Sequence, residues 1–131
     1  MVQLDMIGIV AKDVQASVEF YRQLGIDFPD PEGPYVEATL RGGIRVSINA
    51  AEMVKGIYGD VETGGHSVGL AFLCDSPANV DQMFADLTAK GYKAKLEPFD
   101  AFWGQRYATV LDPDGNAVDL FAPNPPSQND G

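Results

Sequence analysis

The order of apolar and polar residues along this chain predicts strands interleaved with helices. Residues 4–11, LDMIGIVA, form an apolar run of strand length. Residues 35–41, YVEATLR, alternate as a half-buried strand does. Residues 44–50, IRVSINA, follow as the second strand of a hairpin, after a tight turn at Gly42 and Gly43.

A first helix is predicted between these strands. Asp13 is a suitable N-cap and Gly25 a suitable residue to end the helix. Its apolar face has helical spacing and consists of Val14, Val18, Tyr21 and Leu24, with Phe20 nearby. Residues 28–33 are a proline-rich loop, and the Gly-rich residues 52–65 lack a clear period and are also predicted to be a loop.

The second half of the chain repeats this order. Residues 66–73, HSVGLAFL, predict a strand, residues 78–90 a helix that Asn79 caps and Gly91 ends, and residues 92–97 a short strand. The stretch FWGQRYATVLDPDGNAVDLF then supplies two more strands, which the turn DPDGN separates.

The two halves therefore look like a duplication. Twelve residues separate the helix cap from the final glycine in both, Asp13 to Gly25 and Asn79 to Gly91. The predicted class is α+β: two modules of one strand, one helix and roughly three strands, at about 1–55 and 66–122, in one domain over 1–122. Each sheet is covered by its helix on one face, and the other face of a curved sheet can line a ligand cleft. Residues 123–131 are predicted to be a flexible tail.

Composition excludes several classes of partner. The formal net charge is −10, which disfavours binding to nucleic acids and anionic membranes and could favour a cationic ligand. Cys74 is the one cysteine, so no intramolecular disulfide is possible. No apolar run approaches membrane-spanning length, and the chain is expected to be cytoplasmic.

Two segments resemble the vicinal oxygen chelate superfamily, which includes glyoxalase I, extradiol dioxygenases and fosfomycin- and bleomycin-resistance proteins. They are VAKDVQASVEFYRQLG in the first half and FWGQRYATVLDPDGNAVDLFAP in the second. The resemblance covers residues 4–122 and implies paired βαβββ modules and a homodimer with clefts shared between chains.

The resemblance also implies where a divalent metal would bind in related enzymes. Its His, Gln and Glu ligands lie on the first and last strands of both modules, at positions that are Met6, Ser47, Gly69 and Asp119 here. Asp119 occupies the position of the family's carboxylate ligand. A thioether, a hydroxyl and a glycine are poor ligands for zinc, nickel or iron, so we expect neither a family-type metal site nor a cofactor.

Met6, Ser47 and Gly69, at the metal positions, and several residues of the closing segment are candidates for ligand contact. Asp119 shares a strand face with Phe121, and it either pairs with a cationic ligand or is a solvated acid. Trp103 borders the ligand groove in related resistance proteins, or packs in a core or dimer interface. Gln105 and Tyr107 are placed on the strand face of Trp103.

Three other residues are assigned structural roles. Arg106 points to the opposite face and is expected to form an ion pair. His66 is interpreted as a surface residue at a strand edge and Cys74 as a structural cysteine.

Two functions remain open. The first is a metal-free binding protein like the bleomycin-resistance proteins, which holds a flat or cationic molecule such as an antibiotic. The alternative is a divergent glyoxalase-like lyase or isomerase, or a dioxygenase, with an atypical metal site around Asp119 and Glu52.

Overall fold

The computed structural model describes residues 3–59 and 65–126, and side chains in these ranges except those of Tyr58 and residues 65–69. The chain forms two compact units. Unit 1 comprises residues 1–64 with the turn 113–115, and unit 2 comprises the remaining residues from 65 onward. Most of the predicted tail, residues 127–131, and part of the predicted loop, residues 60–64, lie outside the described residues.

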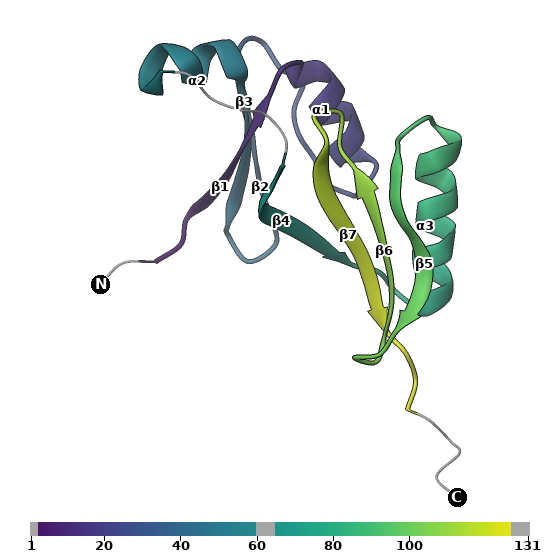
Figure 1. Cartoon of the computed structure of the whole chain (residues 1–131). Helices are drawn as coiled ribbons and strands as arrows, with labels where there is room; N and C mark the ends of the chain where they lie inside the picture. The colour runs from purple at the N-terminus through teal and green to yellow at the C-terminus, as the bar shows by residue number, and fades with distance from the viewer. Residues whose placement is uncertain (1–2, 60–64, 127–131) are drawn as a thin grey trace, which may run out of the picture. The chain divides into compact units, whose positions relative to one another are not determined.

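Unit 1 contains a three-stranded mixed sheet (Figure 1). Its elements are β1 (Met6–Ala11), α1 (Val14–Arg22), β2 (Tyr35–Thr39), β3 (Arg45–Ala50) and α2 (Ala51–Tyr58). The strand order is β1-β3-β2, in which β3 pairs parallel with β1 and antiparallel with β2.

Unit 2 contains a four-stranded mixed sheet. Its elements are β4 (Gly65–Leu73), α3 (Pro77–Ala89), β5 (Ala94–Ala101), β6 (Gln105–Leu111) and β7 (Asn116–Pro123). The strand order is β4-β7-β6-β5, and β4 and β7 are the parallel pair. The helix α3 contacts β5, β6 and β7 and runs alongside them in Figure 1. The predicted α+β class is confirmed.

The capping predictions have different outcomes in the two helices. Asp13 caps α1 as expected, since its carboxylate accepts a hydrogen bond from the Ala16 backbone N–H at 3.1 Å. The prediction that Asn79 caps α3 is wrong. The cap is Ser76, whose Oγ accepts from the Asn79 backbone N–H at 3.1 Å. Pro77 at the first helical position suits this start, because proline has no N–H to satisfy and its φ is already near the helical value.

The prediction of a loop over residues 52–65 is wrong for its first part, where α2 lies. The apolar side chains of Met53, Val54 and Ile57 have helical spacing, and the segment contains the good helix formers alanine, glutamate and lysine. The glycines that suggested a loop obscured this short pattern.

Residues 92–105 also differ from the sequence prediction. The strand β5 runs from Ala94 to Ala101 rather than over residues 92–97, and Trp103 lies in the turn before β6 rather than in a strand. Gly104 in this turn has φ of 91°, a conformation that glycine adopts without strain.

The duplication is confirmed by register, with one strand missing. Counted from the hairpin turn, Ser47 forms the third residue pair between β3 and β2, opposite Glu37. Asp119 likewise forms the third residue pair between β7 and β6, opposite Thr109. Among the described residues of unit 1, β5 has no counterpart, since two strands rather than three follow the helix α1. The corresponding segment, residues 23–34, contains Pro29, Pro31 and Pro34, which cannot donate hydrogen bonds to a neighbouring strand.

Strand alternation divides each sheet into two faces. In unit 2, Val110, Val118 and Leu120 are buried on one face, and Val80 and Leu87 of α3 are buried as well. In unit 1, Val46 and Ile48 are fully or almost fully buried. Because side chains alternate along a strand, Asp119 in unit 2 and Ser47 in unit 1 lie on the opposite face of their sheets. We call this second face of each sheet the open face.

Within the described residues, no helix has the length and apolar character needed to cross a membrane.

The Ser76 cap gives a testable prediction. We expect Ser76→Ala to lower the free energy of unfolding by about 1 kcal/mol, because the Asn79 N–H loses its side-chain acceptor. Urea unfolding followed by circular dichroism measures the change. Ser76→Asp, which keeps an acceptor, should retain wild-type stability within a few tenths of 1 kcal/mol. An equal loss in both variants would contradict the assignment.

Candidate functional site

The open face of unit 2 is built around the Asp119 carboxylate. Thr109 on β6 lies directly opposite Asp119 on β7 and donates a hydrogen bond from Oγ1 to Asp119 Oδ1 at 2.7 Å. Tyr107 donates from its hydroxyl to Asp119 Oδ2. Both carboxylate oxygens are therefore bound by neutral hydroxyls of the adjacent strand, and Asp119 is not a bare solvated acid.

These contacts change the acidity of Tyr107. Burial, together with the hydrogen bond to Asp119 and the negative charge of that residue, raises the pKa of Tyr107 to about 12. The phenol thus remains protonated at neutral pH. Its hydrogen is committed to Asp119, and its oxygen keeps lone-pair capacity for a hydrogen-bond donor.

Trp103, Gln105 and Tyr107 meet as the sequence predicted, although Trp103 lies in a turn. The indole Nε1–H of Trp103 donates to Gln105 Oε1 at 2.8 Å. The ring of Trp103 lies edge-to-face against that of Tyr107, with centroids 5.3 Å apart. Phe121 pairs with Tyr107 across β6 and β7, so it lies on the same face.

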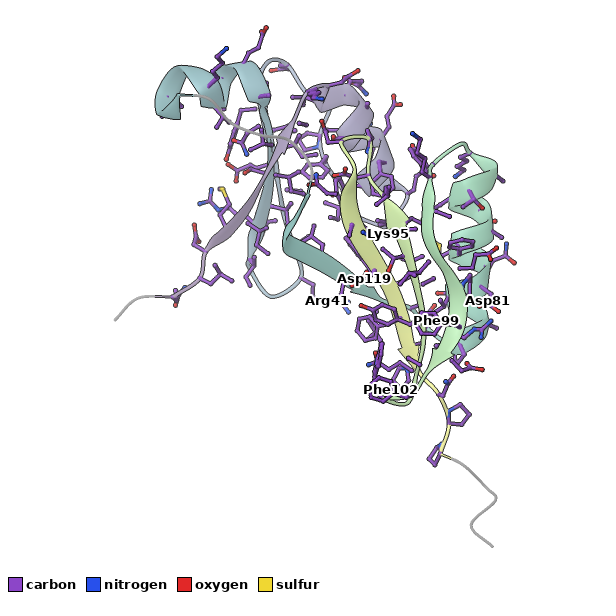
Figure 2. All side chains as sticks on the ribbon, viewed as in Figure 1. Arg41, Asp81, Lys95, Phe99, Phe102 and Asp119 are labelled. Atoms are coloured by element: carbon purple, nitrogen blue, oxygen red, sulfur yellow. The ribbon has the colours of Figure 1, made fainter. Side chains whose placement is uncertain are left out.

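Phe99 is a member of this group that the sequence did not identify. It lies opposite Tyr107 in the pairing of β5 with β6. Its ring centroid is 6.3 Å from that of Trp103 and 6.1 Å from that of Tyr107. We call Phe99, Trp103 and Tyr107 the aromatic cluster. Figure 2 shows Phe99 and Phe102 towards the β5–β6 turn, Asp119 on β7 and Asp81 on α3.

The aromatic cluster is accessible within its unit. Trp103 is 49% exposed and Phe99 36% exposed, while Phe102 at the tip of the turn is 97% exposed. Leu73 and Leu96 are also exposed. Exposed aromatic rings next to a carboxylate are able to stack on a flat molecule or to attract a cation.

The open face of unit 1 has a different polar network. Arg45 donates to Glu37 Oε2 at 2.9 Å and also binds Asp5. Tyr35 Oη lies 2.9 Å from Glu37 Oε1 and 3.8 Å from Met6 Sδ. Arg45 lowers the pKa of the Glu37 carboxyl, and both acids raise the pKa of Arg45. The arginine is thus occupied by two carboxylates and is not a free anion-binding group.

Ser47 is only 1% exposed, and it accepts a hydrogen bond from Asn49 Nδ2 at 3.0 Å. Ser47, the counterpart of Asp119, is thus a buried part of the strand network.

Unit 1 also has a surface depression of about 470 Å³, which is lined by Pro29, Asp30, Glu32, Tyr35, Val36 and Glu37.

Two predicted positions fall where side chains are not described. Gly69 lies in β4, two residues before Ala71, the partner of Asp119, as Met6 lies two residues before Gly8, the partner of Ser47. His66 lies in the same strand, and its side chain is outside the described residues.

The residues at the family's metal positions do not fit a divalent metal site. Asp119 is the one carboxylate among Met6, Ser47, Gly69 and Asp119, and both of its oxygens accept hydrogen bonds from hydroxyls. Glu52, the acid suggested for an atypical site, is exposed in the first turn of α2. No group of three or more His, Cys, Asp or Glu side chains suitable for a metal occurs in the described part of the chain.

The ion pair predicted for Arg106 is confirmed, and the surroundings of Cys74 are consistent with the role assigned to it. Arg106 binds Asp81 of α3, with Nε and Oδ1 2.9 Å apart, and Asp100 of β5 at 3.3 Å. Cys74 is buried, and burial raises the pKa of its thiol, which makes a reactive thiolate less accessible.

Comparison with known proteins identifies the family. The model of the Glyoxalase/Bleomycin resistance protein/Dioxygenase superfamily matches residues 3–120. A search of curated proteins gave no match.

Solved structures of that superfamily have a similar fold. A glyoxalase-related enzyme from Fulvimarina pelagi aligns with a TM-score of 0.81 and 21% identity, over 100% of this chain and 96% of that chain. A family enzyme from Burkholderia phytofirmans PsJN aligns with a TM-score of 0.80 and 22% identity, over 92% and 98%. A lactoylglutathione lyase from Agrobacterium tumefaciens has a TM-score of 0.70 and 19% identity, with 92% of each chain covered. At these identities the likeness concerns the fold.

The pairing of Tyr107 with Asp119 predicts a pH dependence of stability. The pKa of Tyr107 in the folded protein, about 12, exceeds the ordinary value of 10.0. The folded state therefore holds the phenol proton more tightly, and this contribution is complete below pH 10 and lost as the pH rises from 10 towards 12. We expect Tyr107→Phe to lose less stability than the wild type over that range.

Urea unfolding at intervals between pH 8 and pH 12, roughly spanning this transition, measures the effect. Asp119→Asn should be intermediate, because it removes the charge and the carboxylate that accepts the phenol hydrogen but leaves the burial of Tyr107. Identical pH profiles for the wild type and Tyr107→Phe would show that the phenol is not perturbed.

Proposed function

Since this chain belongs to the glyoxalase/bleomycin resistance protein/dioxygenase superfamily, we propose that it is a small-molecule binding protein that works without a metal. Its ligand, a flat or cationic compound such as an antibiotic, binds against the open face of unit 2. Sequestration of such a compound is the corresponding activity.

The aromatic cluster beside Asp119 is the observation that supports this proposal most directly. Phe99, Trp103 and Tyr107 contact one another edge-to-face, so their orientations are fixed before a ligand arrives. Pre-oriented rings lose little conformational entropy on binding, which favours affinity. Trp103 is 49% exposed and contacts Phe99 and Phe102, which are also exposed, and contiguous exposed apolar side chains are typical of interaction sites.

The side chains at the family's metal positions support a site without a metal, because only Asp119 among them is a suitable ligand. The superfamily name includes glyoxalases and dioxygenases, and one structural neighbour is a lactoylglutathione lyase. A lyase, isomerase or dioxygenase of this chain would need ligands other than Met6, Ser47 and Gly69. That alternative is therefore the second candidate, and metal analysis separates it from the first.

The proposal includes two further features. The protein acts as a homodimer, as the family resemblance implies, and it is located in the cytoplasm. The net charge of −10 is consistent with attraction of a cationic compound.

Ligand binding is testable by the intrinsic fluorescence of Trp103, the one tryptophan of the chain. We expect saturable changes on titration with at least one compound from a panel of aromatic cationic antibiotics that includes bleomycin. Phe99→Ala should weaken that binding about 5- to 10-fold, the effect of roughly 1 kcal/mol from one aromatic contact.

Ile57→Ala is the matched control, since it truncates an exposed apolar side chain of unit 1 and should leave the affinity unchanged. Absence of any saturable response across the panel would refute the binding function.

Metal content gives an independent prediction. We expect elemental analysis of the purified protein to show nickel, zinc and iron well below one equivalent per chain. A stoichiometric metal that is lost in Asp119→Ala would instead favour the lyase or dioxygenase.

A further inference from the structure

The hydrogen-bond donors on the open face of unit 2 are largely committed to neighbours within the face. The Tyr107 and Thr109 hydroxyls both donate to Asp119, and the Trp103 indole N–H donates to Gln105. A hydroxyl or an indole has one hydrogen to donate, so none of these three groups has a hydrogen left for a ligand.

The acceptors on the same face are not exhausted. Asp119 Oδ1, Asp119 Oδ2 and Gln105 Oε1 each receive one hydrogen bond here and each have capacity for another. The Tyr107 oxygen gives its hydrogen to Asp119 and keeps its lone pairs for a donor. The aromatic rings add the negative electrostatic potential of their faces. Of the polar groups in this set, the Gln105 amide NH₂ is the remaining donor.

The nearby charged residues do not reverse this polarity. Arg106, which follows Gln105 in β6, faces the other side of the sheet and binds Asp81 and Asp100. Lys95 and Glu97 lie in the part of β5 whose register with β6 is irregular. Their opposite charges add no net charge to this face.

We propose that the open face of unit 2 selects organic cations that donate hydrogen bonds, such as aryl ammonium or amidinium compounds, and disfavours anions. The cation lies against the rings of Phe99, Trp103 and Tyr107, and its N–H groups donate to the oxygens of Tyr107 and Asp119. This inference rests on the proposed function, because it names the ligand class of the same site.

Asp119 has two roles in this arrangement. It supplies the negative charge, and it positions Tyr107 by holding the phenol hydrogen, so that the phenol oxygen presents lone pairs to the ligand. Replacement by asparagine reverses the second role. The asparagine NH₂ would donate to the Tyr107 oxygen, and the phenol O–H would become free to donate to a ligand.

Four probes of similar size test the selectivity: benzamidine, benzylamine, benzyl alcohol and benzoate, each titrated at pH 7 and followed by Trp103 fluorescence and by calorimetry. We expect the two cations to bind at least 10-fold more tightly than benzyl alcohol, about 1.4 kcal/mol, and benzoate to bind most weakly. In Asp119→Asn, the cations should lose about 10-fold in affinity while benzoate gains.

The control variant is Asp30→Asn. It removes the same single charge from the chain and lies in the acidic depression of unit 1, the competing place for a cation. It should keep the wild-type selectivity, and a loss of cation affinity equal to that of Asp119→Asn would overturn the inference.

The outcomes separate the inference from the proposed function. If benzyl alcohol or benzoate binds as tightly as the cations, the selectivity is wrong but a binding site remains. If Asp119→Asn weakens all four probes equally, Asp119 does not set the selectivity and the inference fails. If no probe and no antibiotic binds, both the inference and the proposed function are refuted.

Discussion

Each unit of this protein has to bury one face of a small sheet, and that constraint shapes the rest of the structure. In unit 2 the apolar residues of β6 and β7 form one buried face, and α3 contacts these strands. The opposite face is not covered by a helix of its own unit in the described chain. Because side chains alternate along a strand, burial of Val118 and Leu120 necessarily places Asp119 on that second face.

A carboxylate on a partly buried face needs partners, and the antiparallel neighbour β6 provides them. Thr109 and Tyr107 are two residues apart and share a face, so both reach Asp119. Gln105 lies two residues before Tyr107 on the same face of β6, and it accepts a hydrogen bond from Trp103 in the preceding turn. The aromatic cluster and the acid are therefore consequences of one strand pairing rather than separate features.

The two halves of the duplication share their strand pairing but differ in the side chains at equivalent positions. At the position of Asp119, unit 1 has Ser47, which is buried, and its polar face is organised by Arg45 between Glu37 and Asp5. Unit 1 also lacks the strand that corresponds to β5 and hence any equivalent of Phe99. Three prolines in the corresponding segment disfavour a paired strand, since each lacks a backbone donor. In the part of the chain that the structure describes, the cluster of Phe99, Trp103 and Tyr107 beside an acid thus has no equivalent in unit 1.

The α+β class, the duplication, the cap of α1 at Asp13 and the strand face that Asp119 shares with Phe121 could be predicted from the sequence, because they depend on local periodicity and capping chemistry. The residues at the metal positions that the family resemblance implies could also be read from the sequence. The sequence prediction failed at α2, where glycines obscured the helical spacing, and at the cap of α3, which is Ser76 followed by Pro77. It also failed before β6, where β5 extends to Ala101 and Trp103 lies in a turn. The contact of Phe99 with Trp103, and the hydrogen bonds that already occupy the donors on this face, could be found in the folded structure but not in the sequence, because both depend on the register between strands. Register is fixed by turns, bulges and burial together, and no local pattern in the sequence contains it.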